Sequence, residues 1–439
     1  MMKKVVITVG LFVAASLVAS TPARAVVVVG GSNGWEFSTD GIVDVFATYA
    51  TTTPKPADIG TRSHALSLLS VGGTETTQDQ RFGVGVGLLP SVVAFNVKAP
   101  TTNGVESNVR VGIYPNIQNK SQQRFDTSPS VDFREFFYTA KGAYGELLAG
   151  RALNLYQGKN ILNDMTLLTS GTVPGNAFRG GTTLGHIGYG YLYTNFGPQI
   201  RYTTPDLSGV KVAIAIAEPY KISADTAKTN SPRVEAEIAY AGKFGETSTQ
   251  AWVSGLYQKA PRKTDGVTTP AAVGIVGGVP GIIAASTTVI ARAGKNNESI
   301  GSAAGASAAF SGIGVMASGY LGRGLGMVSV QDGDFLGSTA TDANGKERLA
   351  YGYLVQATYQ LTPSYKLGVN YGQSRQDVNK NEPAGDFIVT NQESAVVALT
   401  YNLNKYIQFV GEVIYAQNTW ADGAKQHSNQ VALGTMFYW

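Results

Sequence analysis

Residues 349–361 read LAYGYLVQATYQL, and this stretch decides the fold class of the chain. Its odd-numbered positions are apolar, and its even-numbered positions are small or polar except for Leu354. After the turn at 362–364, the alternation resumes over 365–372. A period of two indicates a strand with two different faces, and about ten residues is the span that a tilted strand needs to cross a bilayer. We therefore interpret this region as a hairpin with one apolar side.

The same rhythm continues along most of the chain. Short turns, such as those at 205–209, 242–245 and 311–314, alternate with long loops of roughly 10 to 40 residues, as in outer-membrane barrels. We predict an all-β fold, a 16-stranded antiparallel transmembrane β-barrel, with strands at 39–50, 91–98, 106–117, 131–141, 145–153, 198–204, 210–219, 232–241, 247–257, 298–310, 314–323, 347–361, 365–375, 393–403, 406–417 and 428–439.

A soluble β-sandwich is the alternative fold, because each of its sheets also alternates when one face packs a core. Tyrosines near the strand ends favour the barrel, since aromatic girdles form at membrane interfaces.

Residues 270–292 are apolar enough to suggest a membrane helix, but glycine, proline and β-branched residues dominate them. We expect a surface loop with an extended β-excursion there.

The first 25 residues have the pattern of a secretory signal peptide. Lys3 and Lys4 precede an apolar run over 5–18, and the small-x-small site 23–25 follows. Removal would leave residues 26–439 as one barrel domain of 414 residues (439 minus 25). We expect an exported protein of a Gram-negative bacterium.

Charge and cysteine content exclude several classes of protein. The formal charge of +4 falls to +1 when the three basic residues of the leader, Lys3, Lys4 and Arg24, are removed. A nearly neutral chain without a basic stretch argues against nucleic acid as a partner. The chain has no cysteine, so disulfides and thiolate metal sites are excluded, and its 53 glycines and 22 tyrosines favour turn-rich strands over helices.

Three segments resemble the Gram-negative general porins, whose members form 16-stranded barrels assembled as trimers. Residues 134–142 and 145–151 look like the family's hairpin of an Arg-led aromatic strand, a glycine turn and a Gly-Arg strand. Residues 199–209 are similar to its Arg-Tyr strand and proline turn. The terminal Trp439 resembles the C-terminal aromatic that barrel-assembly machinery recognises, although the family more usually ends in phenylalanine.

The resemblance implies that residues 154–198 fold into the barrel as a constriction loop. A connection of about 45 residues is unusual in a compact domain and suggests function. In the family, an acidic loop here faces a basic ladder on the opposing wall. This loop offers a single carboxylate among its charged and titratable residues, which are Lys159, Asp164, Arg179 and His186.

The wall arginines match the family's ladder only in part. Arg134 stands at the matching position, Arg151 and Arg201 match other motif arginines, and Arg110 faces the lumen by parity. The second strand reads SVVA at 91–94 where the family usually has arginine. An arginine facing lipid costs about 2–4 kcal/mol near the midplane, so these side chains should meet water. They either line the eyelet and favour anions or hold the inner loop through salt bridges, and both roles remain open.

Glu135 does not fit the pattern, because alternation with Arg134 turns its side chain toward lipid. Two explanations remain open: Glu135 lies at a strand end, or it lies in a contact between subunits.

Motifs for catalysis and metal binding are weak. The repeats Gly83-x-Gly85-x-Gly87 and 322–326 do not open a helix, and the three histidines are dispersed. We expect no catalytic residue, no metal site and no cofactor.

These observations predict a water-filled porin for passive diffusion of small hydrophilic solutes, slightly anion-preferring. Its expected partners are outer-membrane lipid and lipopolysaccharide, the assembly machinery and two further copies in a homotrimer. The alternatives are a substrate-selective channel, a surface-interaction or structural barrel around a partner such as an electron-transfer protein, and, least favoured, an outer-membrane hydrolase. Single-channel recording would separate a channel from the other classes.

Overall fold

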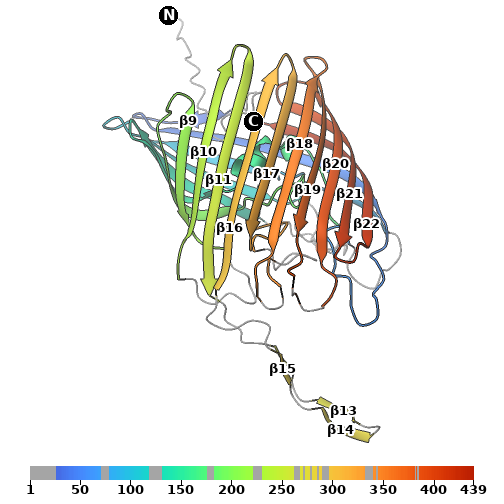
Figure 1. Ribbon diagram of the computed structural model, residues 1–439. Helices are drawn as coiled ribbons and strands as arrows, with labels where there is room; N and C mark the ends of the chain where they lie inside the picture. Colours follow the sequence, from blue (N-terminus) through green and yellow to red (C-terminus); the bar gives the residue numbers. More distant parts are fainter. Residues whose placement is uncertain are drawn as a thin grey trace, which may run out of the picture.

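The computed structural model describes residues 26–70, 79–117, 131–175, 182–220, 230–261, 267–269, 272–276, 279–283, 286–288, 296–331, 340–342, 345–380, 382 and 385–439. The expected signal peptide and Arg179 lie outside these residues. The described chain forms a closed antiparallel barrel of 16 strands, with the consecutive pieces β3 and β4 counted as one interrupted strand (Figure 1). Its wall consists of β2 (Glu36–Thr52), β3 (Asp79–Gly85), β4 (Val92–Lys98), β5 (Glu106–Pro115), β6 (Val131–Gly142), β7 (Gly145–Leu153), β8 (Phe196–Thr203), β9 (Val210–Ala217), β10 (Arg233–Phe244), β11 (Thr247–Pro261), β16 (Asn296–Phe310), β17 (Ile313–Arg323), β18 (Leu349–Gln360), β19 (Tyr365–Gln376), β20 (Val389–Asn402), β21 (Ile407–Trp420) and β22 (Lys425–Tyr438).

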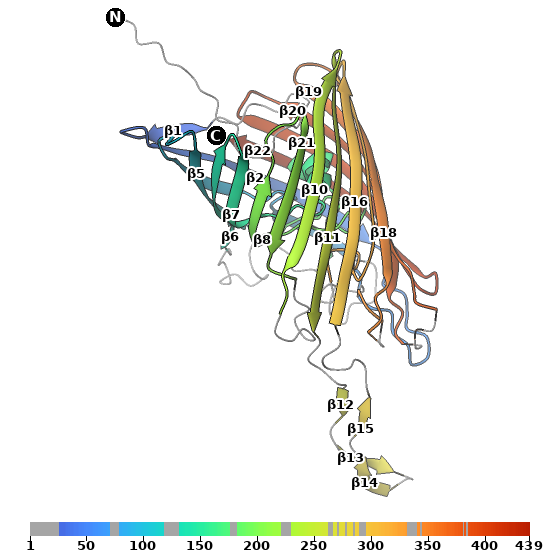
Figure 2. The ribbon, with the colours of Figure 1, turned by 60° about the vertical axis from the view of Figure 1, so that its left-hand side comes forward.

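The barrel closes where the first wall strand meets the last. β2 pairs with β22 from Ile42 opposite Tyr438 to Thr52 opposite Ser428. A short strand, β1 (Val27–Gly30), folds back on β2 beyond the end of β22 and lies at the same end as the C-terminus (Figure 2). Closure pairs the backbone groups at the seam, as a hydrocarbon environment demands.

β3 and β4 are two halves of one interrupted strand. β3 pairs with residues 46–52 of β2 and β4 with residues 36–42. Between them the chain turns into the lumen, where Asp44 accepts a hydrogen bond from the N–H of Gly87 and the N–H of Leu88 donates to Thr169. The predicted strand at 91–98 covers only the second half, because the interruption removes the alternation that would have extended it.

Residues 349–361 confirm the alternation that predicted the barrel. Tyr353, Val355 and Tyr359 are exposed on the outer face, whereas Ala350 and Leu354 are fully buried inside. Leu354, the apolar exception on the inner face, packs in a cluster with residues of the inner loops. The sandwich alternative is wrong, because the apolar face of this sheet is the exposed one and the chain closes on itself.

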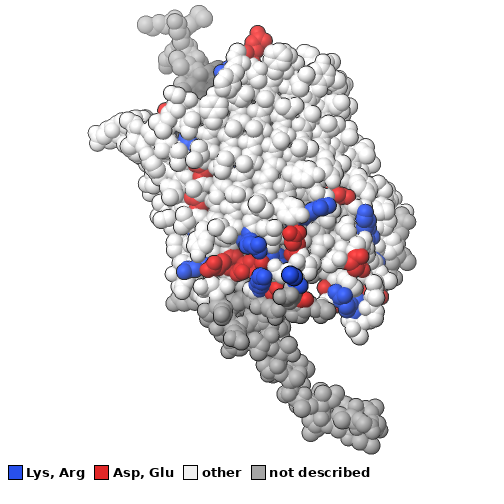
Figure 3. All heavy atoms as spheres, in the orientation of Figure 1, with Lys and Arg blue, Asp and Glu red and all other residues white. Residues whose placement is uncertain are grey.

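The outer surface and the connections agree with a membrane-spanning wall. Figure 3 shows the face over β10–β19, where charged side chains gather toward the end with the long loops and are sparse across the middle. At the other end the turns are tight; Ser311 and Gly312 have φ values of 47° and 82°, which favours a two-residue hairpin turn. No helix in the described part of the chain is long and apolar enough to span a membrane.

Two hairpin ladders occupy the described part of 267–288. β12 (Val267–Thr269) pairs with β15 (Ser286–Thr288), and β13 (Ala272–Val276) pairs with β14 (Val279–Ile283). The expected β-excursion is confirmed for these residues; the rest of the 270–292 stretch lies outside the described ranges.

Candidate functional site

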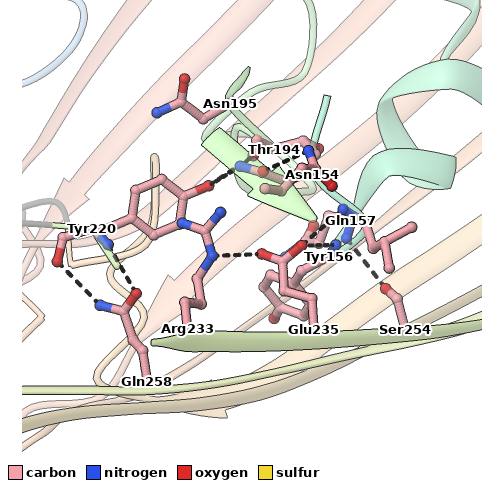
Figure 4. Close-up of polar contacts among 12 residues, drawn as sticks. Asn154, Tyr156, Gln157, Thr194, Asn195, Tyr220, Arg233, Glu235, Ser254 and Gln258 are labelled. Carbon is pink, nitrogen blue, oxygen red and sulfur yellow. Dashed lines mark hydrogen bonds and ion pairs between the residues drawn. The ribbon is translucent and has the colours of Figure 1, made fainter. Parts of the chain in front are cut away.

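The lumen is crossed by the described residues between β7 and β8, 154–175 and 182–195, which we name the constriction loop from here on. It connects β7 to β8 and contains α1 (Gly158–Asn163) and the 3-10 turn η1 (Met165–Leu168). Its neck is fixed by Glu235 on β10, whose Oε2 accepts the backbone N–H of Leu155 at 2.8 Å and of Tyr156 at 3.1 Å (Figure 4). Asn154 closes the neck by donating to the carbonyl of Thr194 at 3.2 Å.

A buried arginine balances the charge of Glu235. Arg233 Nε lies 2.9 Å from Glu235 Oε1, and both side chains are 1% exposed. The guanidinium also sits 4.0 Å from the ring centroid of Tyr220, whose hydroxyl donates to Thr194 at 2.7 Å (Figure 4). Sequence analysis missed this pair. The pattern that could have revealed the pair is the spacing of Arg233, Glu235 and Glu237, which places three charged side chains on one face of a strand.

The far side of the constriction loop is held by β21 and β22. Glu412 accepts the hydroxyl of Thr169 at 2.7 Å and the backbone N–H of Ser170 at 2.8 Å. Gln430 donates to the carbonyl of Val173 and accepts its N–H, both at 2.8 Å. The loop is therefore tied to walls on both sides of the lumen, which fixes the space left for solutes.

Asp164, the expected pore-facing carboxylate, lies in the core of the constriction loop instead. It is 1% exposed and accepts hydrogen bonds from Thr166 N at 2.9 Å and Tyr191 Oη at 2.8 Å. Burial, followed by the charge of Asp164, raises the pKa of Tyr191 well above its usual value. Asp164 caps η1 and offers no open charge to the lumen.

Arg110 faces inward as expected, but two carboxylates enclose it. Its Nη1 donates to Asp40 at 2.9 Å and its Nε donates to Glu135 at 2.8 Å, and the residue is only 6% exposed. Tyr114 adds a hydrogen bond to Glu135 at 2.7 Å. The wall thus contains a closed ionic network, and Arg110 stabilises the wall rather than lining an open eyelet.

A β-bulge explains why Glu135 points inward. The register between β5 and β6 shifts so that Gly112 lies opposite Glu135 and Ile113 opposite Phe133. Arg134 is the extra residue, and beyond it the parity of the strand changes. Sequence alternation assumed an unbroken strand, so the expectation that Glu135 faces lipid or a subunit contact is wrong.

Arg134 and Arg151 lie on the wall next to the constriction loop. Burial raises the pKa of Tyr193 in that loop, and the charges of Arg134 and Arg151 partly oppose the shift. Arg134 also donates to Asp132 at 2.8 Å on its own strand. Arg134 faces inward, with its guanidinium 5.4 Å from the ring centroid of the buried Tyr114. Arg151 lies opposite Phe136 and Pro198, which are exposed on the outer face, so the expectation that it lines the pore is wrong.

An arginine that sequence analysis overlooked lies on the second strand after all. Arg81 is on β3, opposite the inward-facing Ala50, and its Nη1 donates to the carbonyl of Pro174 in the constriction loop. This strand therefore does carry an inward-facing arginine, at a position other than 91–94. Arg81 fell in the half of the strand that the alternation did not reveal, and it supports the role of tying down the inner loop.

The remaining predicted cations meet at the start of the constriction loop. Lys159 on α1 and Arg201 on β8 both lie close enough to Glu237 on β10 to act on its charge. Lys159 also lines a cavity of about 90 Å³ together with Lys211 on β9 and Trp252 on β11. These cations are partly or fully exposed to the lumen.

Trp439 completes the barrel seam. Its carbonyl accepts the N–H of Gly41 at 3.0 Å, and its own N–H donates to Gly41 O at 3.2 Å. A Cβ at position 41 would lie 2.2 Å from the terminal indole, so only glycine leaves room for it. Within the described ranges, no group of three His, Cys, Asp or Glu side chains could hold a metal ion.

A sequence model described as Gram-negative porin matches residues 10–421 of the chain. The chain belongs to the Gram-negative porin family. This porin is accordingly a channel for passive diffusion across the outer membrane of a Gram-negative bacterium. No curated protein matches the chain.

Solved structures share the fold of this porin at low sequence identity. It is similar to the outer-membrane channel DcaP of Acinetobacter baumannii, with 14% identity, a TM-score of 0.61 and coverage of 93% of this chain and 99% of that chain. An anion-selective porin from Comamonas acidovorans shows 15% identity and a TM-score of 0.57, and the match covers 92% of this chain and 100% of that chain. A loop-deleted OmpT of Vibrio cholerae shows 12% identity and a TM-score of 0.53, and the match covers 93% of this chain and 100% of that chain.

The substitution Arg110→Met tests whether Arg110 stabilises the wall or sets selectivity. It leaves Asp40 and Glu135 buried without their cation, and breaking such a pair costs about 3–5 kcal/mol. We expect a lower unfolding temperature of the purified porin in detergent, with an unchanged reversal potential in a planar bilayer. Arg375→Met, at an exposed arginine on the outer face, is the control and should change neither. A shifted reversal potential for Arg110→Met at unchanged stability would contradict this assignment.

Glu235→Ala tests the neck of the constriction loop. The variant removes the acceptor of two loop N–H groups and leaves Arg233 buried and unpaired, so we expect lower thermal stability and noisier, larger single-channel conductance. In the double variant R233L/E235L no charge stays buried, so stability should recover while the conductance noise persists. Quiet, wild-type conductance in both variants would show that the neck does not hold the loop.

Proposed function

We propose that solutes cross this porin between the constriction loop and the wall formed by β5–β9, with a slight preference for anions. Hydrogen bonds anchor the loop to β3, β10, β11 and β18–β22. On the β5–β9 side Gln199 of β8 contacts its neck, and this side is the most open part of the described wall. Lys141, Arg201 and Lys211 on that side are at least partly exposed. The route therefore runs past the cluster of Lys159, Arg201 and Lys211.

The charge distribution of the lumen supports anion preference. The cations of this region outnumber its carboxylates by four to three: Lys141, Lys159, Arg201 and Lys211 against Glu146, Asp206 and Glu237. The inner faces of β18 and β20 carry no charged residue. An excess of fixed cations in a narrow aqueous passage raises the local concentration of anions. Arg110 takes no part in this field because Asp40 and Glu135 neutralise it.

A substrate-selective channel is our second candidate. One observation favours it: the cavity of about 90 Å³ beside Lys159 and Lys211 is also lined by Asp206, Gln250 and the indole of Trp252. Two cations against one carboxylate leave a net positive charge, which together with an amide and an aromatic ring would suit a small carboxylate. Concentration-dependent block of the ion current by small carboxylates would favour this candidate, and its absence would favour general diffusion.

We infer that the passage of solutes needs no catalysis, since a fully paired backbone, an apolar outer face and a water-filled, charged route suffice for diffusion.

We also propose lipopolysaccharide as a partner. Arg323 and Arg375 are exposed at the loop ends of β17 and β19, where cations suit lipid phosphates. The assembly machinery remains a proposed partner on the strength of Trp439.

A homotrimer is proposed from the unequal height of the wall. β8 and β9 have 8 residues each, whereas β11 and β16 have 15 (Figure 2). Eight residues fall short of the roughly 9–11 that a tilted strand needs to cross the hydrocarbon core. The short side nevertheless exposes large apolar side chains, such as Phe136, Ile200 and Ile216. Contact with neighbouring copies would cover this surface better than lipid.

Selectivity tests the proposed route. We expect K159Q/K211Q to move the reversal potential under a salt gradient toward cations, because two fixed positive charges are lost. Lys405→Gln, at an exposed tight turn, removes one positive charge away from the lumen and should leave the reversal potential unchanged. A reversal potential that shows cation selectivity for the wild-type porin would contradict the proposed anion preference.

Dissociation of the assembled porin tests the homotrimer. Phe136→Ala should lower the temperature at which the oligomer separates on a seminative gel, since it removes apolar contact area from the short side. Phe409→Ala makes the same truncation on the tall side, at an exposed ring of the 14-residue β21, and should have little effect. A monodisperse monomer in mild detergent for the wild type would refute the assembly.

A further inference from the structure

A second loop enters the lumen above the constriction loop. Residues 67–70, at the end of the described part of the first long loop, are at most 1% exposed. The carbonyl of Leu68 accepts the N–H of Gly175 in the constriction loop at 2.7 Å. Leu68 and Leu69 share an apolar cluster with Tyr189 and Tyr191 of that loop. The first loop therefore rests directly on the constriction loop instead of extending into solvent.

The tip of this loop is also fixed to the barrel wall. Ser67 and Ser70 both donate their hydroxyls to Gln426 Oε1, at 2.8 and 3.0 Å. Gln426 is on β22 and in turn donates to the carbonyl of Thr53 at the start of the loop. Two ends of residues 53–70 thus converge on one inward-facing amide.

A compact set of contacts joins the same loop to the neighbouring rim at the ends of β20–β22. We name residues 62–65, 385–387, Trp420 and Asp422 the latch. His64 Nε2 lies 3.0 Å from Asp422 Oδ2, and the His64 side chain is 1% exposed. The imidazole stacks on Phe387 at 4.7 Å between ring centroids. Trp420 Nε1 donates to the carbonyl of Ala65 at 2.9 Å. In the sequence His64 is one of three dispersed histidines, and nothing in the pattern indicates this contact.

Charges and backbone pairing reinforce the latch. Arg62 Cζ lies 3.8 Å from the centroid of Phe387, and Ser63 N donates to Asp386 at 2.9 Å. His64 and Phe387 are also Cα partners in an isolated bridge. Burial opposes ionisation of Asp422, but hydrogen bonds from Ala424 N–H and His64 outweigh it and hold the pKa of Asp422 below its usual range. The carboxylate is therefore charged at neutral pH.

We propose that residues 53–70 form a second, latched constriction at the extracellular mouth, which sets the size limit of solutes before they reach the constriction loop. The latch positions the loop, and Leu68 and Leu69 fill the space above the constriction loop. The inference rests on the proposed diffusion route but not on its anion preference, because neutral solutes report the size limit by themselves.

The pair His64→Cys and Phe387→Cys tests the proposal in the full-length porin. The chain has no other cysteine, so any disulfide must join these two positions. Swelling of porin-containing liposomes in neutral sugars of increasing size measures the size limit. We expect the oxidised variant to match the wild type, and reduction to admit larger sugars with a several-fold rise in swelling rate for those near the wild-type limit.

A serine pair, H64S/F387S, removes the latch without thiol chemistry, so the proposal is tested whether or not the disulfide forms. It should behave like the reduced cysteine variant. Asn379→Ser is the matched control, because it breaks a 2.9 Å hydrogen bond to Asp342 that lies outside the latch, although Asn379 is in the same connection between β19 and β20 as residues 385–387, and it should leave the size limit unchanged. An unaltered size limit in both the reduced variant and the serine pair would overturn the second constriction, whatever the reversal potential shows about anions.

Discussion

The structure depends on one constraint: inside hydrocarbon, each backbone N–H and C=O must find a partner in the chain itself. A sheet satisfies this only when its edges meet, and here they meet where β2 pairs with β22 and Gly41 pairs with Trp439. Closure leaves an inner surface that faces the lumen and its loops, and neither lipid nor the core of a soluble domain. The inner side chains are therefore free to form ionic networks and to bind loops.

The inner surface serves two separate tasks. Buried pairs, such as Arg110 with Asp40 and Arg233 with Glu235, are enclosed and hold the wall or the neck of the constriction loop. Cations with solvent access, such as Lys159 and Lys211, remain available to passing solutes. An inward-facing arginine is therefore not by itself a pore residue; its neighbours decide whether its charge reaches water.

The inner loops make the aqueous route much narrower than the barrel. The constriction loop reaches across to β21 and β22, the interrupted strand between β3 and β4 turns in to meet it, and residues 67–70 rest on it from above. These segments bury leucines and tyrosines inside the barrel, where strand alternation alone would place polar residues beside water. Leu354 on the inner face of β18 is explained by this packing.

The sequence alone determined the barrel, the approximate positions of most strands and the inward-folded loop, because lipid and water on opposite faces impose a period of two that local composition records. It failed where backbone irregularity or distant contacts decide the outcome. The bulge at Arg134 reversed the side on which Glu135 lies, and the interruption before Ser91 hid Arg81. Only the tertiary structure could show that Asp164 is buried, that Arg110 is neutralised and that His64 reaches Asp422. Those facts depend on which side chains from distant segments share a volume, and a one-dimensional pattern carries no information about that.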